Sequence, residues 1–381
     1  MGIQVKNIAV LGSTGSIGRQ TLEVISSFPE RFRVIGLAAG ENTALLGKQI
    51  ANFKPRFAHY NKKEDKLLVA DVETISPAEM ASHPDVDIVV IALPGGAGLE
   101  PVISAVKAGK KVALANKESL VTAGEIITKL AGESGAKILP VDSEHSAVWQ
   151  CLEGEATKAS RIILTASGGP FRNYLKEELE KVTPEQALKH PSWKMGKKVT
   201  IDSATLLNKG LEIIEAHWLF DMPYDKISVI VHPQSIIHSM VEFADGAVKA
   251  QLSLPDMRLP IQYALTYPER LVNNKLPRII WEELDRLDFE PPDTDKFPCL
   301  KLAREAGERG GTYPAVLCGA GEAAVELFLS HKIKFTGIPK LVEMALNKHN
   351  AVARPDIEEI KAAEKWAGEI VTDYTARGGV C

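Results

Sequence analysis

The stretch from His190 to Phe220, HPSWKMGKKVTIDSATLLNKGLEIIEAHWLF, holds the side chains best suited to chemistry. Its first half predicts a loop that contains one glycine and places Trp193 and Met195 between lysines. Its second half predicts a helix in which polar groups stand among leucines and isoleucines: Asp202, Ser203, Asn208, Lys209 and Glu212. Packing alone has no use for so many polar groups. We therefore expect a movable lid joined to a helix that binds a small anion or a metal.

Three of these side chains share one edge of the predicted helix. Asn208 and Glu212 are four residues apart, and Lys209 and Glu212 are three apart. Glu212 is then a candidate metal ligand, and Asn208 and Lys209 are candidates for binding phosphate or hydroxyl oxygens. The alternative is a solvated Lys–Glu pair that contributes a few tenths of a kcal/mol. Ser203 lies about 140° around the helix from Asn208, so periodicity does not place it in the same site.

A second acidic group follows the last predicted strand of the N-terminal sheet, in the run 137–145. In extended backbone, side chains two residues apart point the same way, so Asp142 and Glu144 converge on one volume. Two carboxylates that close require a cation or a shared proton. Oxygen ligands suit Mg²⁺ or Mn²⁺ better than Zn²⁺. For this pair alone, the alternative is that Asp142 or Ser143 caps a helix.

The first 150 residues alternate apolar runs of strand length with helical patterns, which predicts a parallel sheet covered on both faces. The runs are 4–12, 32–40, 86–96, 110–119 and 137–145. The first strand leads into Gly12-Ser-Thr-Gly15-Ser-Ile-Gly18, where glycines and a helix start suit a dinucleotide pyrophosphate. The spacing is GxxGxxG rather than GxGxxG, and the alternative is a turn without a ligand. Glu41, after the second strand, favours NAD unless it caps the next helix and faces solvent.

Beyond residue 150 the pattern changes to a single further sheet with the helix 200–219 packed on it. Strands are expected in 161–171, 226–235 and 239–254, the last with a hairpin at Asp245-Gly246. The predicted fold is α/β: an N-terminal Rossmann-like parallel sheet, a central α+β catalytic domain and a C-terminal helical bundle. The predicted domains are 1–150, 151–275 with a lid at 190–199, a linker at 276–311, and 312–381.

Composition narrows the class of protein further. The net charge of -4 argues against bulk nucleic-acid binding. The four cysteines have no CxxC spacing and are expected to be reduced thiols rather than disulfides or zinc ligands. The chain shows no signal sequence and no apolar run of membrane-spanning length. A cytoplasmic protein is expected.

Several motifs occur together in an informative order: GSTGSIG at 12–18, ANKESLV at 115–121, PVDSEHSA at 140–147, TASGGPF at 165–171, and the stretch 190–220. With them, the chain resembles the 1-deoxy-D-xylulose 5-phosphate reductoisomerases. The resemblance implies conversion of that sugar phosphate to 2-C-methyl-D-erythritol 4-phosphate in non-mevalonate isoprenoid biosynthesis. It also implies NADPH, Mn²⁺ or Mg²⁺ (with Co²⁺ as a further option), a homodimer, and inhibition by phosphonohydroxamates such as fosmidomycin.

The resemblance also implies roles for individual residues. It implies that the metal is bound by Asp142, Glu144 and Glu212. It implies that the substrate is bound by Lys117, Ser143, Glu144, Ser167, His190, Ser203, Asn208, Lys209 and Glu212. It implies that the cofactor is bound by Thr14, Gly15, Ser16, Ile17, Gly40, Glu41, Asn42, Asn116, Glu118 and Gly196. Glu41 departs from the basic residue that many members carry there, which bears on the preference for NADPH over NADH; NADPH is nevertheless expected.

The implied reaction is a metal-assisted retro-aldol and aldol rearrangement followed by hydride transfer from the nicotinamide. Lys117, Lys209 or a metal-bound water would move protons. Trp193 would cover the site when the lid closes; the alternative is a core or interface aromatic. Two other classes stay open: a dehydrogenase of the same plan with another phosphorylated or acidic substrate, and a dinucleotide sensor without catalysis.

Overall fold

The computed structural model describes residues 5–61, 72–190, 192–193 and 195–379. Pro191 and Lys194 of the predicted lid, and Cys381, lie outside the described residues. The chain divides into two compact units. The first contains Met1–Ser119, Glu125–Ser146 and Asp256–Pro277, and the second contains Leu120–Gly124, Ala147–Pro255 and Arg278–Cys381. Asp256–Pro277 thus groups with the first unit, whereas the sequence placed nearly all of it in the central domain.

The first unit is built on the predicted parallel sheet. Its order is β4-β3-β2-β1-β5-β6-β7, and all of its strand pairs are parallel. The strands are β1 (Lys6–Leu11), β2 (Phe32–Ala38), β3 (Phe57–His59), β4 (Glu73–Thr74), β5 (Ile88–Ile91), β6 (Lys111–Leu114) and β7 (Lys137–Pro140). Because β1 lies between β2 and β5, the strand order reverses there, and ligands of such sheets bind beyond the carboxyl ends of those strands.

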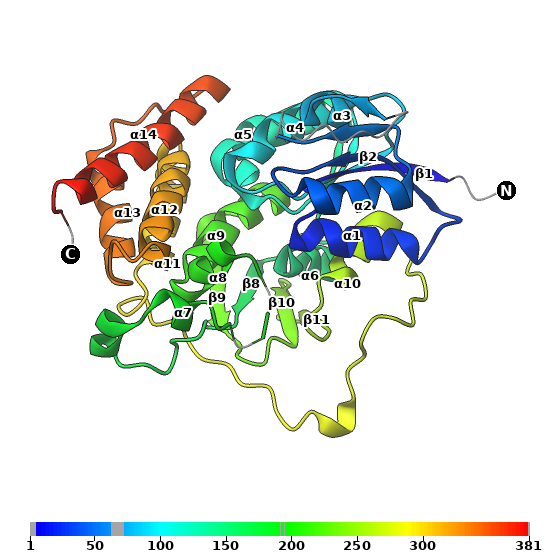
Figure 1. The fold of residues 1–381 in the computed structure, drawn as a ribbon. Helices are drawn as coiled ribbons and strands as arrows, with labels where there is room; N and C mark the ends of the chain where they lie inside the picture. The colour runs from blue at the N-terminus through cyan, green and yellow to red at the C-terminus, as the bar shows by residue number, and fades with distance from the viewer. Residues whose placement is uncertain (1–4, 62–71, 191, 194, 380–381) are drawn as a thin grey trace. The chain divides into compact units, whose positions relative to one another are not determined.

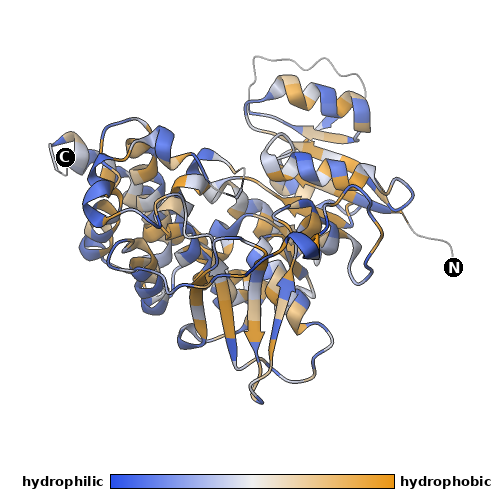
Figure 2. Cartoon of the chain, turned by 90° about the horizontal axis from the view of Figure 1, so that it is seen from below, coloured by the Kyte–Doolittle hydropathy of each residue, from blue (hydrophilic) through white to orange (hydrophobic). Residues whose placement is uncertain are grey.

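Helices cover both faces of this sheet, drawn below and above the strands in Figure 1. They are α1 (Ser16–Ser26), α2 (Thr43–Phe53), α3 (Pro77–Ser82), η1 (Gly95–Gly98), α4 (Leu99–Lys107), α5 (Lys117–Ser134) and α10 (Arg258–Thr266). A further helix, α6 (Ser143–Leu152), begins in this unit and ends in the second. Residues 88–91 of β5 are at most 1% exposed, as covering on both faces requires. Figure 2 shows the same strands as largely hydrophobic. The predicted Rossmann-like sheet is confirmed.

The second unit contains a four-stranded mixed sheet in the order β11-β10-β8-β9. The strands are β8 (Arg161–Ala166), β9 (Ile227–Val231), β10 (Ile237–Glu242) and β11 (Val248–Leu252). β8 runs parallel to β9, and β10 runs antiparallel to β8 and β11. The β10–β11 turn contains Gly246 at φ 87°, and the Asp245 carboxylate accepts from the Ala247 N–H. The predicted hairpin is confirmed.

The predicted helix at 200–219 is two helices, α8 (Lys197–Ala204) and α9 (Leu207–Phe220). Between them, the Thr205 hydroxyl donates to the carbonyls of Ile201 and Asp202, both at 3.1 Å, and closes α8. Leu206 then takes φ 59°, a left-handed conformation that is uncommon outside glycine and redirects the chain. Ser203 and Asn208 therefore belong to different helices, and their angular separation on one helix has no meaning.

The remaining elements of the second unit are mostly helical. They are η2 (Lys176–Lys181), α7 (Pro184–Ala187), η3 (Tyr224–Lys226), η4 (Trp281–Glu283), α11 (Cys299–Arg309), α12 (Tyr313–Leu329), α13 (Gly337–Lys348) and α14 (Ile357–Ala376). α12 packs against α13 and α14, which confirms the predicted terminal helical bundle. α11 lies inside the predicted linker. No helix within the described ranges is long and apolar enough to cross a membrane.

Three cysteines, Cys151, Cys299 and Cys318, are buried as free thiols. Burial raises the pKa of Cys151 to about 11 and that of Cys299 to about 12. The thiolate is the reactive form of cysteine, so burial disfavours the reactive form of Cys151 and Cys299 at neutral pH. The prediction of reduced thiols is in accord with this arrangement.

His349 provides a pH-dependent contribution to stability. The Val352 N–H donates to the Thr312 hydroxyl at 3.0 Å, and this hydroxyl lies 2.7 Å from the His349 Nε2, which it can reach as a donor only if that nitrogen is unprotonated. Burial, followed by the charge of Arg309, lowers the pKa of His349 below its ordinary value of 6.5.

A lowered pKa means that the unfolded chain takes up this proton first, so the stabilisation is complete above the ordinary value and is lost as the pH falls through the folded pKa. The His349→Gln variant is expected to be less stable at pH 7 by about 1 kcal/mol. It should also lose less stability than the parent on acidification, measured by urea unfolding at a series of pH values. Equal pH slopes for the two proteins would contradict this role.

Candidate active site

The glycine turn after β1 has the backbone that a phosphate-binding loop requires. Gly12 has φ 90°, and a Cβ there would lie 2.3 Å from the Ala92 carbonyl oxygen. A Cβ on Gly18 would lie 2.2 Å from the Gly12 carbonyl oxygen, so helix and turn are in close contact. α1 begins at Ser16 without a side-chain cap on its first turn. Thr14, Gly15, Ser16 and Ile17 thus surround a helix N-terminus at the reversal of strand order, where an anion is favoured.

The segment after β2 brings Gly40, Glu41 and Asn42 to the same edge of the sheet. The Asn42 side chain accepts from the Leu45 N–H at 3.1 Å and so caps α2. The helix-capping alternative for Glu41 is therefore wrong, because the cap is the next residue. Glu41 itself is exposed.

Asn116 is held in a structural role that the sequence did not reveal. Its amide donates to the carbonyls of Leu93 and Gly95, both at 2.9 Å, and its Oδ1 accepts from the Ser119 N–H at 3.1 Å. A Cβ on Gly98 would lie 2.4 Å from this oxygen. The side chain thus fastens the loop after β5 to the start of α5.

Lys117 and Asp142 meet at the ends of the adjacent strands β6 and β7. The Lys117 Nζ lies 2.5 Å from the Asp142 Oδ2, and both side chains are largely buried. Oxygens of Asp142 and Glu144 lie within 4.8 Å of each other, as predicted. The sequence analysis derived this proximity from an extended backbone, and that derivation is wrong. The chain is helical here, because α6 begins at Ser143 and carries Glu144 in its first turn. The Ser143 hydroxyl donates to Glu144 at 2.5 Å.

His145 belongs to this group and was missed by the sequence analysis. Its ring is fully buried, and its Nδ1 lies 3.9 Å from the Asp142 Oδ2. The available signal was its position three residues after Asp142 at a helix start, which brings the two side chains to one face.

In the second unit, His190 joins Ser167 and Ser203. The His190 Nδ1 accepts from the backbone N–H of Trp193 at 2.9 Å and of Ser192 at 3.2 Å. The Nε2 therefore carries the proton, and it lies 3.0 Å from the Ser167 hydroxyl and 3.2 Å from the Ser203 hydroxyl. Sequence periodicity could not place Ser203, but the break between α8 and α9 does. Together these groups present two hydroxyls and an oriented imidazole donor.

The predicted edge of α9 is confirmed. Lys209 and Glu212 are buried, with their side chains 5% and 1% exposed, and they form an ion pair. The Asn208 amide donates to the other oxygen of Glu212. A solvated surface pair is excluded by this burial.

Trp193 lies in the predicted lid and is half-buried. Its ring meets the His238 ring edge to face, with centroids 5.9 Å apart, and the His238 Nε2 lies 3.1 Å from the Ser253 carbonyl oxygen. His238 is a second residue that the sequence did not single out. Gly196 lies within the predicted lid, and it is the N-cap residue of α8, with no side-chain hydrogen bond to the first turn.

Each unit thus contains a set of candidate functional groups. The first has a dinucleotide turn, two close carboxylates and a lysine. The second has a hydroxyl–imidazole cluster of Ser167, His190 and Ser203, and an Asn–Lys–Glu edge on α9. Carboxylates bind hard divalent cations, while hydroxyl, amide and ammonium groups bind the oxygens of a polar anionic substrate.

Models of one protein family match three parts of the chain. Residues 8–124 match 1-deoxy-D-xylulose 5-phosphate reductoisomerase, and residues 138–220 match the C-terminal domain of that enzyme. Residues 252–370 match the DXP reductoisomerase C-terminal domain.

Full-length relatives agree. The chain is 54% identical over 375 residues to 1-deoxy-D-xylulose 5-phosphate reductoisomerase of Pelotomaculum thermopropionicum, covering 95% of this chain and 97% of the relative. It is 54% identical to the enzyme of the same name from Desulforamulus reducens, covering 96% and 97%.

Solved structures show the same fold. A DOX-P reductoisomerase in complex with NADPH, fosmidomycin and magnesium has a TM-score of 0.93 and 37% identity, covering 98% of this chain and 100% of that one. The Zymomonas mobilis 1-deoxy-D-xylulose 5-phosphate reductoisomerase in complex with NADPH has a TM-score of 0.90 and 40% identity, covering 98% and 99%.

Proposed function

Since this chain belongs to the 1-deoxy-D-xylulose 5-phosphate reductoisomerase family, we infer that it converts 1-deoxy-D-xylulose 5-phosphate to 2-C-methyl-D-erythritol 4-phosphate with NADPH and a divalent metal ion. This reaction is a step of non-mevalonate isoprenoid biosynthesis. The observation that carries the inference is the near-complete match to relatives of that name. The dinucleotide turn, the carboxylate pair and the polar edge of α9 support it, each at its expected place in the fold.

We propose that Asp142, Glu144 and Glu212 hold the metal. Their donors are all carboxylate oxygens, a set that suits Mg²⁺ or Mn²⁺. Asp142 and Glu144 already lie within 4.8 Å of each other, and Glu212 is a buried carboxylate that needs positive partners. When bound, such an ion supplies Lewis-acid polarisation of the substrate's carbonyl and adjacent hydroxyl.

Substrate binding is assigned to both units. Ser143 and Lys117 in the first unit, and Ser167, His190, Ser203, Asn208 and Lys209 in the second, supply donors for the phosphate and hydroxyls. His190 is fixed as an Nε2–H donor by the two backbone groups on its Nδ1. The ammonium groups of Lys117 and Lys209 lie next to the carboxylates of Asp142 and Glu212. Each lysine can therefore donate a proton to a developing alkoxide or return one to the neighbouring carboxylate.

The cofactor is assigned to the crevice beyond the carboxyl ends of β1 and β2. The residues are Thr14, Gly15, Ser16, Ile17, Gly40, Glu41, Asn42, Asn116, Glu118 and, within the predicted lid, Gly196. The two neighbouring structures with NADPH support this cofactor. Glu41 offers no positive charge to a 2′-phosphate, so another group must meet it.

The direct test is an absorbance assay with 1-deoxy-D-xylulose 5-phosphate, NADPH and Mn²⁺, run with and without EDTA. NADPH consumption should stop on chelation and return with added metal. A parallel series with NADH measures cofactor preference. No NADPH consumption in the presence of metal would refute the function, and equal or higher kcat/KM with NADH would refute the cofactor assignment.

We propose that Trp193 is the lid residue that covers the bound substrate. The Trp193→Ala variant is expected to raise KM for the sugar phosphate and to weaken fosmidomycin binding by about tenfold or more, because a buried aromatic contact is lost. The cofactor KM should change little. Trp281→Ala, which removes an exposed tryptophan elsewhere, is the matched control. Unchanged substrate KM and inhibitor affinity would exclude the lid role.

We also propose a cellular location and an oligomeric state for the protein. A cytoplasmic enzyme is proposed from the buried free thiols Cys151, Cys299 and Cys318. A homodimer is proposed from the family resemblance, and light scattering at several concentrations tests it.

A further inference from the structure

The junction between α8 and α9 separates two groups of proposed substrate donors. Ser203 lies at the end of α8, and Asn208 lies at the start of α9. Between them, Leu206 takes the left-handed φ of 59°. A residue other than glycine persists in that conformation only where its surroundings enforce it. The contacts that enforce this backbone therefore decide where the donors on both helices lie.

Thr205 makes the first of these contacts. Its hydroxyl shares one proton between the carbonyls of Ile201 and Asp202, both at 3.1 Å, in the last turn of α8. The same oxygen accepts from the N–H of Leu207, the first residue of α9, at 3.4 Å. Thr205 is buried, so water does not replace these bonds when the hydroxyl is removed.

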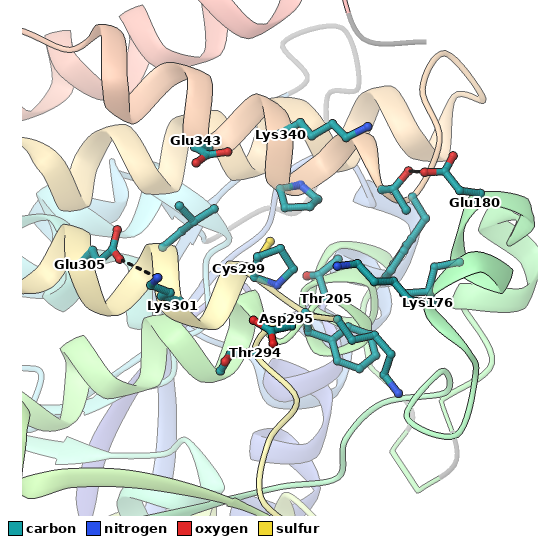
Figure 3. Close-up of a pocket in the computed structure, with 18 residues that line it drawn as sticks. Lys176, Glu180, Thr205, Thr294, Asp295, Cys299, Lys301, Glu305, Lys340 and Glu343 are labelled. Carbon is teal, nitrogen blue, oxygen red and sulfur yellow. Dashed lines mark hydrogen bonds and ion pairs between the residues drawn. The ribbon is translucent and has the colours of Figure 1, made fainter.

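Helix α11 supplies a further partner for this hydroxyl. Cys299, the first residue of α11, is buried, and its thiol is hydrogen-bonded to Thr205. Burial raises the pKa of the thiol to about 12, so the thiol stays protonated and donates to the Thr205 oxygen. Both residues line the cavity drawn in Figure 3. The Thr205 hydroxyl thus links α8, α9 and α11.

Helices α9 and α11 also meet at Gly210. A Cβ on Gly210 would lie 2.3 Å from the Ala303 Cβ and 3.5 Å from the Cys299 carbonyl oxygen. Glycine inside a helix is less favourable than alanine, and this close approach accounts for its presence. Because Gly210 directly follows Lys209, the contact fixes the turn of α9 that carries the Asn–Lys–Glu edge.

The turn that carries Ser167 packs on the same junction. Gly169 has φ 68°, and a Cβ there would lie 3.0 Å from both the Ala204 Cα and the Ser203 carbonyl oxygen. The Ser167 hydroxyl accepts from the Gly169 N–H at 3.2 Å. The end of α8 thus supports both hydroxyls that lie beside the His190 imidazole.

We propose that Thr205 and Gly210 are positioning residues of the substrate site. They hold the end of α8 and the start of α9 on α11, and they act through the donors on these helices. This role rests on the proposed function, since the site is the one assigned to 1-deoxy-D-xylulose 5-phosphate. A parent protein that consumes no NADPH with this substrate would refute that function and this role with it. An active parent with unaffected variants would refute the positioning role alone.

Thr205→Val removes the hydroxyl and keeps the shape of the side chain. The KM for the sugar phosphate is expected to rise about tenfold or more, while the KM for NADPH stays parental. Thr205→Ser retains the hydroxyl and should restore the substrate KM.

Thr266→Val is the matched control, because it removes a buried hydroxyl of the same kind from the first unit. The Thr266 hydroxyl donates to the carbonyls of Gln262 at 2.9 Å and Glu269 at 2.8 Å, at the end of α10. This variant should lose thermal stability as Thr205→Val does, but it should keep the parental KM values. A parental substrate KM in Thr205→Val, or an equal rise in Thr266→Val or Thr205→Ser, would overturn the role of Thr205.

Gly210→Ala tests the contact with α11 separately. The new methyl group would displace α9 from α11, and a shift of about 1 Å near reacting groups costs about a hundredfold in rate. We expect kcat/KM for the sugar phosphate to fall about ten- to a hundredfold. Gly210→Ala/Ala303→Gly moves the methyl group from one helix to the other and should recover most of the loss. A fully active single variant, or a double variant no better than the single one, would overturn the role of Gly210.

Discussion

Glu212→Gln is expected to lower kcat/KM for 1-deoxy-D-xylulose 5-phosphate by about a thousandfold, because the change removes the charge of one of the three proposed metal ligands. The metal concentration that gives half-maximal rate should rise in the same variant. Glu212 is a reliable target for this test because it is 1% exposed, so solvent does not replace the missing charge. Intact turnover with unchanged metal dependence would exclude the three-carboxylate site.

The same substitution affects folding, and the two effects can be separated. Removing one partner of a buried ion pair costs about 3–5 kcal/mol, whereas replacing both partners by neutral groups of similar volume is often harmless. The double variant Lys209→Met/Glu212→Gln should therefore recover thermal stability that Glu212→Gln loses, and it should stay inactive. Glu308→Gln, an exposed position on α11, controls for loss of one negative charge.

Lys117→Met is expected to lower kcat by about a hundredfold or more, because it removes the ammonium that is 2.5 Å from Asp142 and able to act as a general acid. The pH dependence of kcat should change as well, since the residue that the proposal makes a proton donor is absent. Lys117→Arg keeps the charge at Asp142 and should keep metal affinity, but not the full rate.

Lys107→Met serves as the control, since Lys107 is an exposed lysine of the same unit. A Lys117→Met enzyme with the parental kcat and pH profile would leave Lys209 or a solvent proton as the alternative donor. A loss confined to metal affinity would assign Lys117 to positioning Asp142.

Several features of the fold could be predicted because they depend on local pattern. Buried strands such as β5 read as unbroken apolar runs, and the turn at Asp245-Gly246 requires a residue with positive φ. The edge formed by Asn208, Lys209 and Glu212 follows from helical geometry alone. These predictions needed no knowledge of contacts between segments distant in sequence.

Other features depend on tertiary structure and could not be predicted in this way. No glycine or proline marks the break between α8 and α9 in the sequence. The residue with left-handed backbone at this break is a buried leucine, Leu206. Ser203 meets His190 only because of that break. Asn116 was assigned to the cofactor, but its amide is used by carbonyls more than 20 residues earlier in sequence. The grouping of Asp256–Pro277 with the first unit likewise depends on packing between segments that are distant in sequence.

The labelling rates of the buried thiols measure how often the helices around them open. Cys151, Cys299 and Cys318 lie in α6, α11 and α12, and a buried thiol reacts with a reagent in solution only after its helix opens. With Cys381 changed to serine, the rate of labelling by a disulfide reagent would therefore report opening frequencies at three places in one unit. Repeating the measurement with cofactor or inhibitor bound would show which helices a ligand holds shut.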